Sequence, residues 1–108
     1  MSIQLPAPID RYFSMGSEPD LFVIDQCFAS DGVVCDEGRN ITGIPAIKAW
    51  RESALAKYRF KTEPLSMTAE GSNTIVLCRV TGHFPGSPAM LIHTFQISSG
   101  RIISLEIR

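Results

Sequence analysis

The hydrophobic repeat of this chain changes near Arg59, and this change constrains the fold more than any other feature. Before that point apolar residues recur every three or four positions, as they do along one face of a helix. After it they alternate with polar residues, as they do along a strand with one buried face. The 108-residue chain therefore divides into a helical half and a sheet half. Such segregation is typical of an α+β domain.

Three helices are expected in the first half. The first follows Pro6 and Pro8 and ends at Gly16. The second begins with the N-cap pattern of residues 17–20, carries Phe28 on its apolar face and stops near residues 30–32. The third opens at residues 43–45 and has the clearest pattern: an apolar stripe through Ile47, Trp50, Ala54 and Tyr58, and on its other faces Lys48, Arg51, Glu52 and Lys57.

Short strands complete the expected architecture. A hairpin over residues 33–37 and 41–42 separates the second and third helices. Four further strands are expected over residues 58–69, with a break at Pro64, and over 74–84, 89–98 and 102–107. We therefore expect an α+β fold in which three N-terminal helices pack on a curved, mainly antiparallel sheet and leave a conical pocket. Residues 1–108 are expected to form a single domain.

Charge and cysteine content exclude several classes of protein. Ten basic and eleven acidic residues give a formal net charge of −1. The chain therefore lacks the excess of basic residues that is typical of a nucleic-acid-binding protein. No apolar run approaches the roughly 20 residues of a membrane span, and residues 1–8 lack the pattern of a signal peptide. Three cysteines without C-x-x-C spacing suggest neither disulfides nor zinc. We expect a cytoplasmic protein with no metal, no cofactor, and no nucleic acid or membrane as partner.

Strand periodicity assigns the two faces of the sheet. Along residues 74–84 the apolar set Val76, Cys78 and Val80 should face the helices. Along residues 89–98 both faces are partly apolar, since Leu91, His93 and Phe95 alternate with residues that include Met90 and Ile92. An outer face of this kind predicts a homodimer formed through the sheet.

The inward-facing residues predict the lining of the pocket. Its ionisable members are Tyr12, Asp36 and His93. A mainly apolar pocket of this kind suits a small apolar ligand. The expected ligand-binding wall consists of Phe28, Trp50, Val76, Cys78, Leu91 and Leu105.

Four stretches resemble a known family. Residues 9–12 (IDRY), 27–36 (CFASDGVVCD) and 42–50 (TGIPAIKAW) are similar to the SnoaL-like branch of the nuclear transport factor 2 superfamily, and so is the closing segment 100–105. The resemblance covers nearly the whole chain and implies the cystatin-like cone fold. Because that superfamily includes polyketide cyclases, ketosteroid isomerases and scytalone dehydratases, the resemblance defines the fold more sharply than the chemistry.

The resemblance also implies site residues. The steroid isomerases of the superfamily use a tyrosine on the first helix, an aspartate on the first strand and a second, protonated aspartate on a later strand. Tyr12 and Asp36 match the first two positions. His93 stands at the third and departs from that pattern.

Each candidate residue has a chemical and a structural interpretation. Asp36 follows Val34 at strand spacing, so it would point inward and move a proton, or else it would bond to backbone amides in the turn at Gly38. His93 would act as an acid or base, or would be a satisfied core histidine. Tyr12 would stabilise an oxyanion, or would pack in the core with its hydroxyl satisfied.

Asp36 and His93 would form an acid/base dyad if both faced one cavity. A carboxylate within hydrogen-bond reach would then raise the pKa of the imidazole. Glu37 has the opposite strand parity and is expected to be solvated.

Two functions follow from these residues. The first is a small cofactor-independent lyase or isomerase that acts by proton transfer on a compact apolar carbonyl compound. In it Asp36 moves the proton while Tyr12 and His93 stabilise the enolate oxygen, or His93 is the base and Asp36 orients it. The second is a non-catalytic module of the same fold that binds a hydrophobic ligand or interacts as a dimer.

Overall fold

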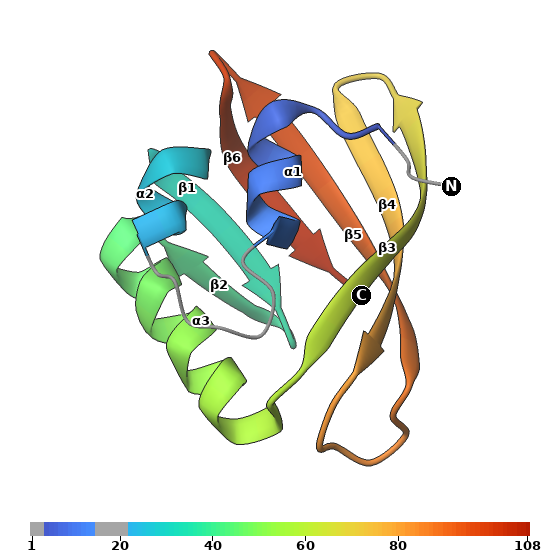
Figure 1. Ribbon diagram of the computed structural model, residues 1–108. Coiled ribbons are helices and arrows are strands. Elements are labelled where there is room, and N and C mark those ends of the chain that lie inside the picture. Colours follow the sequence, from blue (N-terminus) through green and yellow to red (C-terminus); the bar gives the residue numbers. More distant parts are fainter. Residues whose placement is uncertain (1–3, 15–21) are drawn as a thin grey trace.

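Three helices lie in residues 4–14 and 22–108, the ranges that the computed structural model describes (Figure 1). They are α1 (Ala7–Ser14), α2 (Phe22–Cys27) and α3 (Ile44–Tyr58). Gly16 and the expected N-cap pattern of residues 17–20 lie outside the described ranges. In the described part of the chain, no helix combines the length and the apolar character that a membrane span requires.

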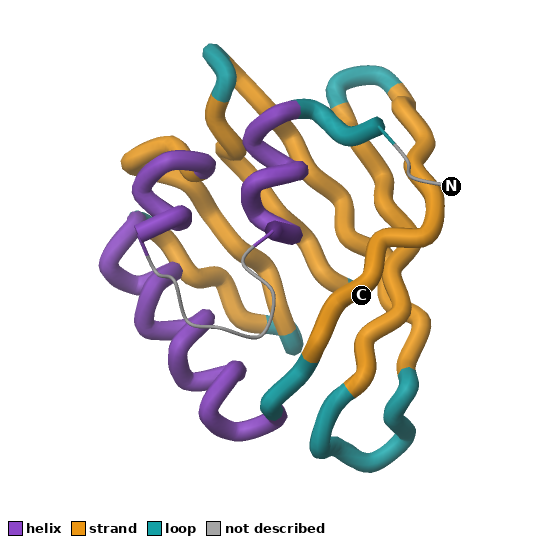
Figure 2. Tube along the Cα trace, viewed as in Figure 1, coloured by secondary structure: helices purple, strands orange, loops and turns teal. Residues whose placement is uncertain are grey.

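Six strands form one curved sheet (Figure 2). Its order is β2-β1-β6-β5-β4-β3, and β1 with β6 is the parallel pair in an otherwise antiparallel arrangement. The α+β class and the mainly antiparallel sheet are therefore confirmed. The strands are β1 (Phe28–Asp36), β2 (Arg39–Thr42), β3 (Lys61–Glu70), β4 (Asn73–Thr81), β5 (Ala89–Ser98) and β6 (Arg101–Ile107).

The core lies between the helices and one face of the sheet. Val76, Cys78 and Val80 of β4 are buried in it, which confirms the expected strand parity. From the helices, apolar side chains of α1, α2 and α3 enter the same cluster: Ile9, Tyr12, Ile24, Cys27, Ile47 and Trp50. In Figures 1 and 2 the three helices lie on the same side of the sheet.

The expected end of the second helix is wrong. α2 stops at Cys27, and Phe28 begins β1 opposite Ile102 of β6. The register between β1 and β6 then shifts between Phe28 and Val33. A Cβ at Gly32, within this irregularity, would lie 3.1 Å from the Ala29 carbonyl oxygen, so the backbone is closely packed there. Long-range strand pairing has overridden a helical spacing that was only local.

Two expected strand boundaries are also corrected. β3 passes through Pro64 without a break, because β3 is an edge strand and the residue after Pro64 is accommodated by a register shift against β4. β4 ends at Thr81 instead of reaching Phe84. The reason is Gly82, where a Cβ would lie 2.8 Å from the Phe60 Cα, so that the chain leaves the sheet and packs against the segment after α3.

Candidate functional site

A cavity of about 420 Å³ lies between α1, α3 and the inner face of the sheet. Its volume is in the range of pockets that enclose small organic ligands. Aromatic side chains make much of its wall, and few polar groups interrupt them. The aromatic residues are Tyr12, Trp50, Tyr58, Phe60 and Phe84.

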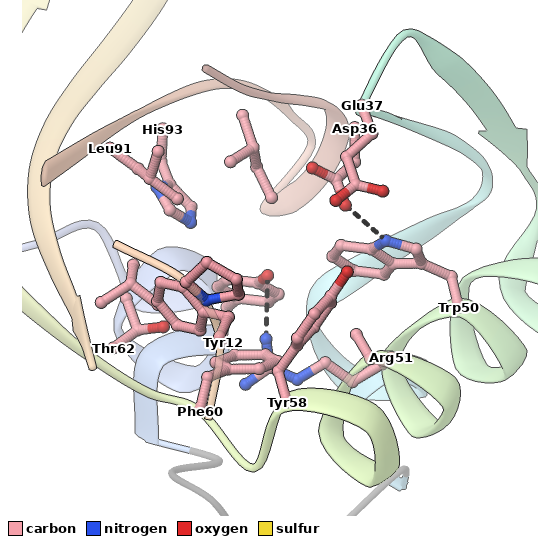
Figure 3. A pocket seen from close by; sticks show the side chains of 15 residues that line it. Tyr12, Asp36, Glu37, Trp50, Arg51, Tyr58, Phe60, Thr62, Leu91 and His93 are labelled. Atoms are coloured by element: carbon pink, nitrogen blue, oxygen red, sulfur yellow. Dashed lines mark hydrogen bonds between the residues drawn. The ribbon is translucent and has the colours of Figure 1, made fainter. Parts of the chain in front are cut away.

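The structure brings five of the predicted site residues together in this cavity: Tyr12, Asp36, Trp50, Leu91 and His93. They come from α1, β1, α3 and β5 (Figure 3). Residues from four elements, distant in sequence, therefore face one space.

The other four predicted wall residues do not line the cavity. Phe28, Val76, Cys78 and Leu105 are buried in the hydrophobic core. The Tyr12 ring covers this part of the sheet, with its centroid 5.9 Å from that of Phe28. Because α1 fills the inner face here, these side chains support the cavity without bordering it.

Asp36 lines the cavity, where the indole of Trp50 holds its carboxylate. Trp50 Nε1 donates a hydrogen bond of 2.9 Å to Asp36 Oδ2. The alternation from buried Val34 places the carboxylate on the inner side, as the strand spacing predicted. Its side-chain partner among the described residues is thus Trp50 and not a turn amide, and the second carboxylate oxygen remains available to a ligand.

Glu37 is exposed, as expected, and yet it also borders the cavity. It adopts a left-handed backbone conformation, with φ of 52°, and Gly38 follows with φ of 76°. Strand parity no longer applies in such a turn, and the Glu37 side chain lies beside Asp36 in Figure 3. Two carboxylates therefore stand at this end of the cavity, where strand parity predicted one.

His93 is almost completely buried, with 3% of its surface exposed. Its ring stacks on Phe95, with centroids 6.2 Å apart and planes inclined by 25°. Nδ1 is buried and has no hydrogen-bond partner among the described residues. Burial, aided by the charge of Arg51, lowers the pKa of His93 to about 4. The expected rise of this pKa through Asp36 is therefore wrong, and the imidazole is neutral at pH 7.

Arg51 also lines the cavity, which the sequence analysis did not predict. Its residue type predicts a position on a charged helix face, yet only 4% of Arg51 is exposed. Its Nη1 donates a hydrogen bond of 3.2 Å to Tyr12 Oη, and its Cζ lies 5.1 Å from the Tyr12 ring centroid. The signal was present, because Arg51 is four residues from both Ile47 and Leu55 and so continues their buried stripe.

Tyr12 contributes a buried hydroxyl to the site. Burial raises its pKa, while the guanidinium of Arg51 opposes that rise. At pH 7 the phenol is thus protonated and able to donate.

Among the described residues, no group of three or more His, Cys, Asp or Glu side chains is placed to hold a metal ion.

Solved structures with this architecture identify the family. A candidate polyketide cyclase from Sinorhizobium meliloti is 39% identical to this chain, with a TM-score of 0.92 over 96% of this chain and 95% of its own. A SnoaL-like candidate polyketide cyclase from Jannaschia has a TM-score of 0.74 at 17% identity, covering 100% and 90%. This chain belongs to the SnoaL-like branch of the nuclear transport factor 2 superfamily.

More distant structures share the fold of this SnoaL-like protein. A protein from Catenulispora acidiphila with a ketosteroid isomerase-like fold, solved in complex with trimethylamine, is 17% identical, with a TM-score of 0.82 over 97% of this chain and 86% of its own. No protein-family profile matches the SnoaL-like chain, and no protein of curated function matches it. The relatives therefore establish the fold and family and do not specify a reaction.

Proposed function

We propose that this protein is a small cofactor-independent isomerase or lyase that moves a proton on a compact apolar carbonyl compound. The cavity would be a cone closed by the helices, with the reacting group between its two polar ends. One observation carries the proposal: a carboxylate fixed by Trp50 shares an apolar cavity with two uncharged hydrogen-bonding groups, Tyr12 and His93. This is the combination that enolisation requires.

In the proposed reaction Asp36 is the base. Its free carboxylate oxygen removes a proton from the carbon next to the carbonyl group, and the electron pair moves onto the carbonyl oxygen. The Tyr12 hydroxyl and neutral His93 donate hydrogen bonds to that oxygen as its charge develops. In an isomerisation Asp36 then returns the proton to another carbon. In an elimination the electron pair of the enolate forms the double bond and expels a leaving group from the β-carbon, and that group takes the proton that Asp36 holds.

The inverted assignment, with His93 as base, has less support. A histidine whose pKa is about 4 is a weak base at pH 7. Asp36 is held by Trp50, so its partner is not the imidazole. We therefore assign the proton transfer to Asp36 and the stabilisation of the oxyanion to Tyr12 and His93.

A non-catalytic binding protein is the second candidate. The observation favouring it is the pair of carboxylates, Asp36 and Glu37, beside the rings of Trp50 and Tyr58. Carboxylates and aromatic faces together attract ammonium groups, and the Catenulispora protein was solved with trimethylamine. In this alternative the cavity would hold a small apolar amine without transforming it.

Hydrogen–deuterium exchange tests the catalytic proposal. In deuterated buffer, wild-type protein is expected to accelerate exchange of the α-protons of compact aryl and β,γ-unsaturated ketones, followed by NMR. Asp36→Asn should reduce the rate by about 100-fold or more, the usual effect of losing a general base. Asp31→Asn, at an exposed carboxylate on the same strand, is the matched control and should retain the wild-type rate. Equal rates for Asp36→Asn and wild type would contradict the proposal.

Ligand binding separates the two candidates. A phenol mimics the enolate, and the amide introduced by Asp36→Asn would mimic a protonated base, so this variant should bind phenols more tightly. An amine-binding protein would instead lose affinity for trimethylammonium in both Asp36→Asn and Glu37→Gln, with phenol binding unchanged. Thermal-shift titrations measure both outcomes.

A cytoplasmic location belongs to the same proposal. Cys27, Cys35 and Cys78 are free thiols, and the first and last of them are buried. Unpaired cysteines of this kind are common in reducing compartments.

A further inference from the structure

The direction of the Tyr12 proton is set by its neighbour. A phenolic oxygen carries one proton and can also accept hydrogen bonds. Because Arg51 Nη1 has only protons to offer, Tyr12 Oη accepts in their 3.2 Å contact. The hydroxyl proton must then point elsewhere, and no hydrogen bond among the described residues takes it up. Tyr12 lines the cavity, and its oxygen points toward the middle of it in Figure 3.

Arg51 is held in place by two rings. Its Cζ lies 5.1 Å from the centroid of Tyr12 and 4.8 Å from that of Phe60, in the segment between α3 and β3. Cation–π contacts of this kind strengthen when they are desolvated, and the Arg51 side chain is buried. The guanidinium is therefore fixed relative to α1 as well as to its own helix.

The charge of Arg51 acts on both oxyanion-stabilising groups. It counters the rise in the pKa of Tyr12 that burial causes, and it favours the neutral form of His93. His93 is thereby kept neutral, while the Tyr12 phenol stays protonated because the effect of burial outweighs that of Arg51. A positive charge this close also favours the negative oxygen itself.

We infer that Arg51 is a positioning residue, which caps one side of the Tyr12 oxygen and turns the hydroxyl proton toward a ligand oxygen that carries negative charge. The inference rests on the proposed function, since a proton-transfer reaction is what creates an oxyanion there. It also defines the ligand class: a compound with an acceptor oxygen at the Tyr12 end and an acidic C–H at the Asp36 end. Ligands whose polar group is only a donor are disfavoured.

A double-mutant cycle with Arg51→Gln and Tyr12→Phe tests the inference. The probes are a series of substituted phenols of increasing acidity, with the matching anisoles as controls that lack the hydroxyl. Trp50 is the only tryptophan of the chain and lines the cavity, so quenching of its fluorescence reports binding without any turnover.

Arg51→Gln is expected to weaken binding of the most acidic phenols about tenfold, as expected for loss of a charge-assisted contact. It should flatten the dependence of affinity on phenol acidity and leave anisole binding unchanged. In the Tyr12→Phe background the same substitution should have little further effect. Equal loss for phenols and anisoles, or an undiminished effect in Tyr12→Phe, would show a merely structural role and overturn the inference.

Arg51→Lys keeps the inference testable if Arg51→Gln fails to fold, which circular dichroism would show. The lysine retains the charge but cannot reproduce the planar guanidinium, so the acidity dependence should persist with reduced slope. An unchanged slope and affinity would also count against the inference. Failure of Asp36→Asn to slow proton exchange would contradict the proposed function alone, so the two ideas fail separately.

Discussion

His93 shows how burial alone can reverse an expected chemical role. The residue was expected to gain basicity from a carboxylate, but its ring lies beside Phe13 and Phe95, with centroid separations of 5.6 and 6.2 Å. Desolvation of the imidazolium then dominates, and the pKa falls. A neutral imidazole in this position serves as a hydrogen-bonding group and not as a general acid or base.

The free energy of unfolding should therefore depend on pH through His93. The ordinary pKa of 6.5 applies to the unfolded chain and about 4 to the folded one, so the unfolded state binds the proton more tightly. Stability is expected to fall by on the order of 3 kcal/mol as pH drops from 6.5 to 4, at about 1.36 kcal/mol per pKa unit, with little further change above pH 7. Urea unfolding across this range measures it.

The matched controls for that experiment are the two histidine variants. Because carboxylates also titrate near pH 4, the quantity to compare is the difference between wild type and variant. His93→Gln should flatten the profile between pH 5 and 6.5. His83→Gln removes an exposed imidazole and should leave the slope intact. A slope that survives His93→Gln would contradict the assignment.

Arg51 shows which kind of site residue cannot be predicted from residue type and local spacing. Tyr12, Asp36 and His93 could be placed from spacing and resemblance, since each follows the parity of apolar neighbours. Arg51 shares the buried stripe of α3 with Ile47 and Leu55, but a charged residue is almost never buried without partners, and its partner Tyr12 is 39 residues away. Local spacing cannot reveal such a contact.

At the level of elements, strand parity was the most reliable signal. The alternation along β4 and β5 correctly predicted which side chains are buried, because a one-residue slip would expose the whole apolar set. Boundaries set by distant contacts were not predictable: the start of β1 at Phe28 depends on its pairing with Ile102 of β6. The left-handed turn at Glu37, likewise, brought a second carboxylate to the edge of the cavity against its parity.

Gly82 offers a test of how the cavity wall is positioned. A Cβ there would lie 2.8 Å from both the Phe60 Cα and the Tyr58 carbonyl oxygen, and these atoms cannot move without moving the backbone. The same carbonyl accepts a hydrogen bond of 2.6 Å from the His83 N–H. Gly82→Ala should therefore lower the free energy of unfolding by about 1–3 kcal/mol, the range for overpacking.

Urea unfolding checks that value, with Thr81→Ala as the control. Thr81 is the adjacent exposed residue at the end of β4, so its truncation should change stability by less than about 0.5 kcal/mol. Gly82→Ala should also weaken phenol binding, because Tyr58 and Phe60 line the cavity. Equal stabilities of the two variants would show that the segment tolerates the displacement.

At the scale of the whole molecule, we propose a homodimer formed through the outer face of the sheet. Ile92 and Met90 of β5 are 45% and 54% exposed. Ile92 lies opposite Leu77 on β4, so the apolar residues are contiguous across neighbouring strands. A monomer that exposes such a patch commonly covers it with a partner subunit.

Ile92→Lys should dissociate this dimer. In a twofold interface the substitution occurs twice, so two charges are buried together, and the dissociation constant should rise at least about tenfold. Sedimentation velocity at micromolar concentration measures the association. Asn40→Lys, on the exposed edge strand β2, adds the same charge elsewhere and should leave it unchanged. A wild-type chain that sediments as a monomer would contradict the proposal.

The parallel pairing of β1 with β6 has a consequence for synthesis of the chain. Val33 and Val34 lie beside Ser104 and Leu105, which are about 70 residues later in the sequence. On the ribosome, β1 therefore emerges long before the strand that covers its inner edge. During this interval its unpaired backbone groups are open to other chains. A nascent protein of this fold would need protection, by a chaperone or by transient local structure, until translation has passed β6.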